Sequence, residues 1–509
     1  MLRFKSRQEN IKISIMNTKN SSLLILLIVI VLTFPSCSEE FVTKQFENGV
    51  VSENFFKNAT HAEQALTAVY DIIGQRGMYR ESQWVIGDAT SDDINELTGD
   101  NGDYGTYYRA ASDYRWETNN PYSTTRWFDS YKGIFRANQL LEKLPEIEMD
   151  GALKSRMAGE AKFLRSLYYF NLIMAFGDVP LVTTVLTREE YLELARTDRQ
   201  IIYAQMEQDL IEAAAVLSTE ASDPVGRATK GAANGLLSRV YLYQEKWNEA
   251  ANAAKLVIDA NYELVDSENF IDMFNGHLEN SKESVFEFQS VGFATGTWGG
   301  QTENIYSFFW SPLIGWANWY SPSVGSQEQF VDGDIRRKAS LLIVGKNDSI
   351  DTDGDGVVEF FPSGNMNGNY YNNANVRKFL PEGRNLSNSN NYDVNFPIIR
   401  YAEILLNYAE AQNETGSTTE ALSALNEIRN RAMVPVITET DQDILRNLIR
   451  EERRRELVFE GQRFHDLQRW GIAEEILSPL GYRAGTHEYW PVPLAELDLM
   501  KNLTQYPPN

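Results

Sequence analysis

Apolar side chains recur every three or four residues over long stretches of the chain, and this spacing predicts amphipathic α-helices. The clearest stretch follows Pro397, and its apolar face consists of Tyr401, Ile404, Leu405, Tyr408 and Ala411. Proline suits the first turn of a helix, so we expect this helix to begin at Pro397 and to end before Gly416. The remaining positions, which we expect on the opposite polar face, include Glu403, Asn407, Glu410 and Glu414.

The same periodicity predicts helices over residues 62–73, 127–144, 158–176, 202–217, 230–260, 421–432 and 445–457. Residues 243–250 and 414–421 each lie between two amphipathic helices, at equivalent places in two helical hairpins. Such pairs resemble tetratricopeptide repeats, which bury their apolar faces by stacking on neighbouring pairs. We therefore predict a mostly α fold with a tetratricopeptide-like helical-pair scaffold.

Two long stretches interrupt this pattern, residues 82–122 and 266–396. Both are rich in Gly, Asn, Asp and aromatic residues, and only Ser284–Phe288 alternates in the way that predicts a short strand. A compact domain seldom keeps such long irregular segments unless they serve a function. We expect two long irregular, aromatic-rich insertions, and we expect the functional site to lie there.

The N-terminal segment has the pattern of a lipoprotein signal peptide. A basic lead precedes the apolar run Leu23–Leu32, which is too short to span a membrane comfortably, and the only cysteine, Cys37, follows a small residue. We predict a signal peptide over residues 1–36, starting at Met1 or Met16, lipid attachment at Cys37, and a tether over residues 37–60. The alternative is that Cys37 is an ordinary buried thiol.

Charge narrows the classes of partner. The formal net charge of −24 argues against nucleic acid, whose phosphates require a basic surface. It does not by itself identify a ligand.

Several motifs resemble those of the RagB/SusD family: Arg400–Leu406, Tyr408–Ala411, Leu425–Arg429, Glu451–Glu456, Gly461–Leu467 and Ala161–Leu181. The resemblance covers both halves of the chain. It implies a surface-facing outer-membrane lipoprotein, with Ser38-Glu39-Glu40 as its export tag, that binds a nutrient glycan and delivers it to a SusC-like TonB-dependent transporter. It also implies a SusD-like N-terminal helical region over 61–265 and a C-terminal region over 266–509, with a ligand-loop insertion (266–396) and a helical scaffold (397–470).

Aromatic residues in the insertions are the candidate ligand contacts. Sugar rings stack their C–H faces on flat side chains, and nearby polar groups such as Gln301 and Asn304 then bind the hydroxyls. The candidates are Trp298, Trp310, Trp316, Trp319 and Tyr320 in the second insertion, and Tyr104 and Tyr107, next to Tyr108, in the first. The alternative is that these rings pack the insertions onto the helices.

An acidic segment in the second insertion resembles the front half of an EF-hand loop. Asp351, Asp353 and Asp355 alternate before Gly356, and Glu359 offers a further oxygen ligand for Ca²⁺. Pro362 stands where an EF-hand has its bidentate Glu. The alternatives are therefore a calcium site and a solvated acidic turn; no other cofactor is expected.

No catalytic motif stands out, so we expect a binding protein and not an enzyme. The run Arg450–Glu456 alternates charges at helical spacing, which favours a structural salt-bridged face. His465 lies in a family-like motif and is expected to be structural. Two alternatives stay open: the same transporter role with a peptide or other non-glycan nutrient, and a surface glycosidase that uses two of the many carboxylates.

Overall fold

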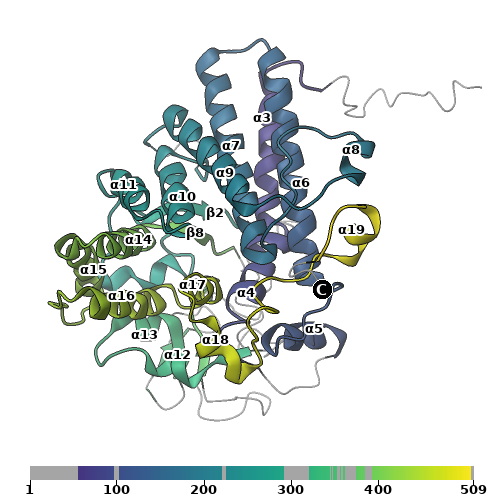
Figure 1. The fold of residues 1–509 in the computed structure, drawn as a ribbon. Coiled ribbons are helices and arrows are strands. Elements are labelled where there is room, and N and C mark those ends of the chain that lie inside the picture. The colour runs from purple at the N-terminus through teal and green to yellow at the C-terminus, as the bar shows by residue number, and fades with distance from the viewer. Residues whose placement is uncertain are drawn as a thin grey trace, which may run out of the picture. The chain divides into compact units, whose positions relative to one another are not determined.

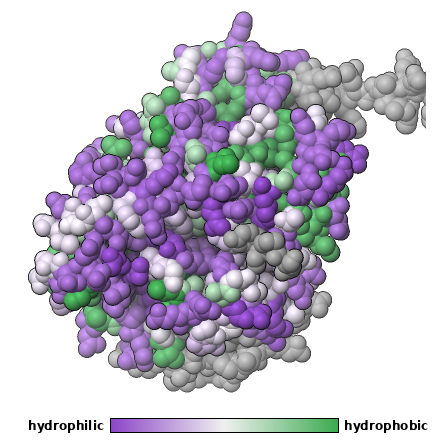
Figure 2. Space-filling view, in the orientation of Figure 1, coloured by the Kyte–Doolittle hydropathy of each residue, from purple (hydrophilic) through white to green (hydrophobic). Residues whose placement is uncertain are grey.

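The computed structural model describes residues 55–96, 102–220, 225–291, 320–343, 346, 348–351, 356, 359–360, 374–383 and 393–505. Residues from Phe56 to Asn509 form one compact unit. It is mostly helical, as predicted. On the face seen in Figure 2, hydrophilic residues cover most of the described surface.

Long helices from the first half of the unit pack side by side (Figure 1): α3 (Ala59–Tyr70), α6 (Pro121–Lys143), α7 (Gly151–Phe176) and α9 (Arg199–Val216). Side-chain caps fix where they begin. Asn58 accepts a hydrogen bond from the N–H of His61, and Asp150 accepts one from the N–H of Leu153. At its C-terminal end, α7 stops at Gly177, whose φ of +67° favours glycine.

Helical hairpins continue the packing, with α9 against α10 and α11 against α14. Their members are α10 (Lys230–Leu242), α11 (Trp247–Ile258), α14 (Tyr401–Glu414), α15 (Thr418–Arg431) and α16 (Gln442–Leu457). Gly416 has φ +83° and ends α14, as predicted. The two predicted hairpins are present, and their likeness to tetratricopeptide repeats stays a prediction.

Shorter elements lie between and after these helices. The short helices are α4 (Ser82–Gly87), α5 (Gly102–Ser112), α8 (Arg188–Leu192), α12 (Val324–Glu328), α13 (Ile335–Ser340), α17 (Arg463–Arg469), α18 (Ala473–Leu477) and α19 (Leu494–Leu499). The strands are β1 (Ile94–Glu96), β2 (Ser284–Phe288), β3 (Tyr320–Pro322), β4 (Leu341–Ile343), β5 (Ser349–Ile350), β6 (Glu359–Phe360), β7 (Ala374–Val376) and β8 (Phe396–Arg400). They form two-stranded antiparallel pairs: β1 with β3, β2 with β8, β4 with β7 and β5 with β6.

The predicted helix start at Pro397 is wrong. Pro397 lies in strand β8, where it pairs with Glu287 of β2, and α14 begins only at Tyr401. The residues of β8 are all buried, and the register is irregular there, which is the kind of position where a strand tolerates proline. The predicted strand Ser284–Phe288 is confirmed as β2, and β8 is its partner.

The loop predicted over residues 82–122 is also wrong in part, because this stretch contains α4, β1 and α5, and α6 already begins at Pro121. Stacked aromatic rings explain why this stretch forms regular elements. Tyr108 lies 5.1 Å from Trp84 and 4.6 Å from Tyr122, between ring centroids, and all three are buried. A glycine- and aspartate-rich composition conceals this aromatic core at the level of sequence.

The predicted polar face of α14 is not a solvent face. Glu403, Asn407 and Glu410 are at most 3% exposed, and each has a buried partner. Arg239 donates to Glu403, Arg453 donates to Asn407, and Arg469 donates to Glu410. The helix is therefore buried on both sides by neighbouring helices, which its polar periodicity could not reveal.

Candidate functional site

The two insertions meet in the antiparallel pair β1–β3. Ile94 pairs with Pro322, and Glu96 pairs with Tyr320. Strand β1 belongs to the first insertion and β3 to the second, while α5, which carries Tyr104 and Tyr107, packs against β1. The structure thus brings together the elements that carry candidate ligand residues from the two insertions.

Two arginines of the scaffold hold this pair of strands through the carboxylates that precede β1. Arg454 Nη2 lies 2.7 Å from Asp93 Oδ1 and 2.9 Å from Asp92 Oδ2, and Arg463 Nε lies 2.7 Å from Asp92 Oδ1. Ser323, directly after β3, donates its N–H to the Asp93 carbonyl and its hydroxyl to the Asp92 carbonyl. We call these five residues with β1 and β3 the insertion junction.

Burial sets the electrostatics of the insertion junction. Asp93 is fully buried, and burial raises its pKa although Arg454 opposes the shift. Burial also acts to raise the pKa of Asp92, but Arg463 and Arg454 outweigh it and lower that pKa. The two arginines therefore favour the charged form of Asp92, whereas at Asp93 Arg454 only offsets part of the effect of burial.

A second attachment joins α4 to the segment before α17. The N–H of Gly461 donates to both carboxylate oxygens of Asp88, at 3.0 and 2.9 Å, and Gln83 donates its amide to the Gly461 carbonyl at 3.2 Å. A Cβ added at Gly87 would lie 2.2 Å from that carbonyl oxygen, so only glycine permits this approach. The motif Gly461–Leu467 therefore contacts the first insertion through both Gly461 and Arg463.

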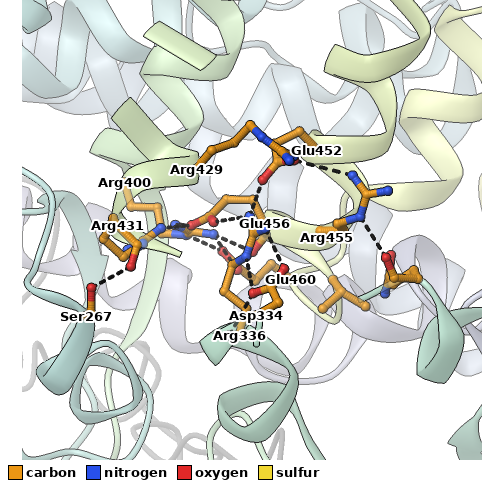
Figure 3. A network of polar contacts seen from close by, with 12 residues as sticks. Ser267, Asp334, Arg336, Arg400, Arg429, Arg431, Glu452, Arg455, Glu456 and Glu460 are labelled. Carbon is orange, nitrogen blue, oxygen red and sulfur yellow. Dashed lines mark hydrogen bonds and ion pairs between the residues drawn. The ribbon is translucent and has the colours of Figure 1, made fainter. Parts of the chain in front are cut away.

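A buried group of charged side chains, which we call the charge network, includes residues of α16 (Figure 3). Its members are Glu283, Asp334, Arg336, Lys378, Arg400, Arg429, Arg431, Glu452, Glu456 and Glu460. Figure 3 labels all of them except Glu283 and Lys378. Glu456 is its centre: Arg400 Nη1 lies 2.5 Å from its Oε1, Arg336 Nη1 lies 3.1 Å from its Oε2, and Arg431 also contacts it. Burial acts to raise the pKa of Glu456, but Arg431, Arg400 and Arg336 outweigh it and hold that pKa well below its usual range.

The run Arg450–Glu456 is structural, as predicted. Most of its ion pairs, however, join α16 to other elements and do not lie along one helix face. Arg455 does pair with Glu451 and Glu452 within α16. Arg453 is buried and bonds to Asp466 of α17, and Arg454 reaches the insertion junction. The run connects α16 to several other elements.

The predicted ligand contacts are placed unequally. Tyr107 is half-buried on α5, while its neighbour Tyr108 belongs to the aromatic core. Tyr104 lies in α5 and Tyr320 in β3, where the structure describes the backbone. Outside the described residues lie Cys37, Trp298, Trp310, Trp316 and Trp319. These assignments therefore stay predictions.

The calcium prediction also stays untested. Asp351 is buried, and its carboxylate accepts a hydrogen bond from the N–H of Gly356 at 3.1 Å. Glu359 lies in β6 and pairs with Ile350 of β5, whereas Asp353 and Asp355 lie outside the described residues. Within the described ranges, no three His, Cys, Asp or Glu side chains are grouped so that they could hold a metal ion.

The sequence does not reveal the insertion junction, because the residues that form it are remote from one another along the chain. The Arg454–Asp93 hydrogen bond joins residues 361 positions apart, and no local periodicity reports such a pair. The only local signals were the adjacent carboxylates before β1 and the excess of arginine in α16.

In the described part of the chain, no helix has the length and apolar character needed to cross a membrane.

Comparisons with known proteins agree with this architecture. The SusD family model matches residues 279–488, and a model described as "Starch-binding associating with outer membrane" matches residues 50–242. A solved laminarin-binding SusD-like protein is 31% identical, with a TM-score of 0.75, over 89% of this chain and 99% of its own. The chain belongs to the SusD family.

Curated members of the SusD family match over most of their length. A SusD-like protein from Formosa agariphila is 25% identical over 93% of this chain and 96% of its own. The starch-binding protein SusD from Bacteroides thetaiotaomicron is 24% identical over 70% of this chain and 73% of its own. The predicted family is thus confirmed. Within it, the family-like motifs supply Arg400, Glu452 and Glu456 to the charge network, and Arg454 and Arg463 hold the insertion junction.

Proposed function

We propose that this SusD-family protein captures a nutrient glycan at the cell surface and delivers it to a SusC-like TonB-dependent transporter. The insertion junction is the observation that carries the proposal. It joins the two aromatic-rich insertions and bonds them to a buried, charged scaffold. Membership of the SusD family and the similarity to a laminarin-binding protein support a glycan as ligand.

Binding would require stacking and hydrogen bonding, with no bond made or broken in the ligand. A rigid platform favours such binding because less conformational entropy is lost when the ligand docks. The ion pairs of Arg454 and Arg463 supply that rigidity at the base of the two insertions. The aromatic residues of the insertions would then present their faces to the sugar rings.

The test is direct binding by the chain from Ser38 onward, measured by calorimetry and tryptophan fluorescence. Laminarin and starch head the panel, because relatives are named for binding them. Trp316→Ala and Trp319→Ala should each weaken binding about tenfold, since a lost stacking contact costs about 1–1.5 kcal/mol. Trp247→Ala, on α11 outside both insertions, is the matched control and should bind as the unmodified chain does.

The outcomes separate the open alternatives. Saturable binding without sugar products supports capture, whereas release of shorter glycans on long incubation supports a glycosidase. Saturable binding of peptides with indifference to every glycan would replace the ligand class and keep the delivery role. Equal losses in the three tryptophan variants would place the site outside the second insertion.

We also propose that a lipid on Cys37 holds the protein at the outer membrane, facing outward. Cys37→Ala should move the protein from the outer-membrane fraction to the soluble fraction. Cys37→Ser keeps a polar side chain but lacks the thiol, so it should have the same effect. Co-purification with a TonB-dependent transporter from solubilised membranes tests the partner. Retention of the Cys37→Ala protein in washed outer membranes would contradict lipid anchoring.

A further inference from the structure

A small, partly open cavity lies between α4, α6, α7, α10 and the segment before α17. Its volume is about 20 Å³, which is room for one water-sized occupant. The polar side chains that line it include Tyr79, Gln83, Arg126, Asn171, Arg239 and His465.

Arg126 is the main feature of this cavity. It is 2% exposed, and its guanidinium donates to the amide oxygen of Asn171, to Gln83 Oε1 at 3.1 Å and to the Met78 carbonyl at 3.5 Å. All these acceptors are uncharged. Its Nε is buried without a hydrogen-bond partner. An arginine carries five donors, so Arg126 keeps donor capacity that the surrounding described residues do not use.

The charge of Arg126 is also uncompensated by a direct ion pair in the described residues. The other buried cations nearby are matched: Arg239 by Glu403, Arg453 by Asp466 and Arg469 by Glu410. Asp129, one turn along α6, influences Arg126 through space, but its carboxylate accepts the N–H of Gly77. A buried cation without an anionic partner is costly, and one anion would remove that cost.

A further donor faces the same space. The hydroxyl of Tyr79 accepts a hydrogen bond from Asn171, so its own proton remains available for donation. His465 also lines the cavity, and burial and the Arg126 cation lower its pKa to about 4, so the ring is neutral. Its side chain hydrogen-bonds Gln468, so we do not count it as a donor to the cavity. The unused donors are therefore the Nε–H of Arg126 and the hydroxyl of Tyr79.

We propose that this cavity binds one small monovalent anion, chloride under natural conditions, with Arg126 as its principal ligand. A single halide matches the volume, the unused donors and the single uncompensated positive charge. Gln83 bonds both Arg126 and the Gly461 carbonyl, so the anion would stabilise the attachment of α4 next to the insertion junction.

The experiment uses the chain from Ser38 onward, which contains the whole compact unit. Its Tm is measured while sodium chloride replaces sodium gluconate at constant ionic strength. A specific site should raise Tm saturably, by about 1–3 °C up to about 0.3 M chloride. Arg126→Gln should abolish this dependence. Arg165→Gln, which removes another buried arginine that is paired with Asp209, should lower Tm but keep the chloride dependence.

Crystals grown in sodium bromide provide a readout that needs no variant. An anomalous peak within hydrogen-bond distance of the Arg126 guanidinium would establish the anion. A Tm that is independent of chloride, together with ordinary water density and no bromide peak at Arg126, would overturn the proposal. Chloride dependence that persists in Arg126→Gln would also overturn it, because the effect would then arise elsewhere.

Discussion

Glu456→Gln is the substitution that most directly tests the charge network. The carboxylate of Glu456 is fully buried and contacts Arg336, Arg400 and Arg431. Glutamine preserves the shape but removes the negative charge. It also replaces one acceptor oxygen by an NH₂ group that faces guanidinium donors, so the cations that Glu456 neutralises remain buried beside a neutral side chain.

The expected loss of folding stability in Glu456→Gln follows from the burial of this side chain. Breaking a buried ion pair by neutralising one partner costs about 3–5 kcal/mol, because the remaining charge is left uncompensated. Glu451→Gln is the matched control, five residues earlier on the same helix. Its side chain is 58% exposed and pairs only with Arg455 in the described structure, so its loss should cost about 0.5 kcal/mol or less.

Equilibrium unfolding in urea, followed by tryptophan fluorescence, measures both variants against the unmodified chain at pH 7. The pKa of Glu456 is held well below its usual value, so its stabilisation is present at every pH above about 4.5 and is lost only as the pH falls further. The deficit of Glu456→Gln should therefore be the same at pH 5.5 and pH 7. Equal losses for Glu451→Gln and Glu456→Gln would refute the distinction between a surface face and a buried network.

Three further predictions concern the insertion junction, the buried histidine and the acidic segment. Arg454→Met leaves the fully buried Asp93 without its ion pair, so urea unfolding should show a loss of about 2–3 kcal/mol; unchanged stability would contradict the junction. The pKa of His465 is lowered to about 4 in the folded state, so only the unfolded state gains a proton there as the pH falls below about 6.5, and this destabilises the fold. His465→Gln should reduce this acid destabilisation by up to about 3 kcal/mol near pH 4.5. Parallel profiles of stability against pH for the variant and the unmodified chain would refute this prediction. If the acidic segment binds Ca²⁺, calorimetric titration should detect binding that Asp353→Ala combined with Glu359→Ala abolishes, and binding that survives in the double variant would remove the predicted site.

Much of the helical scaffold could be predicted because its signal is local. A helix that buries one face repeats apolar residues every three or four positions, and the buried residues of α3, α11 and α15 follow this pattern. The helix stop at Gly416 could be predicted for a similar reason, since a left-handed backbone there favours glycine. The motifs that indicate the SusD family lie in this same scaffold.

The predictions from sequence were wrong where the same local pattern is compatible with more than one tertiary structure. Pro397 is compatible with a helix start and with an irregular strand, and only the pairing with β2 selects the strand. Glu403 and Glu410 look like solvent-facing positions, yet Arg239 and Arg469 make their burial possible. The partner that decides each case lies on another element.

The sequence by itself determined the mostly helical class, the hairpins and the family, whereas the placing of a ligand site in the two insertions stays a prediction. Only the tertiary structure decided that β1 and β3 join the insertions, that Arg454 and Arg463 hold them, and that Arg126 lies beside a small cavity without an ionic partner in the described structure. The physical reason is the distance along the chain over which the two kinds of interaction act. Helical periodicity depends on neighbours within a few residues, whereas a buried charge is stable only beside partners that the folded chain brings from remote positions.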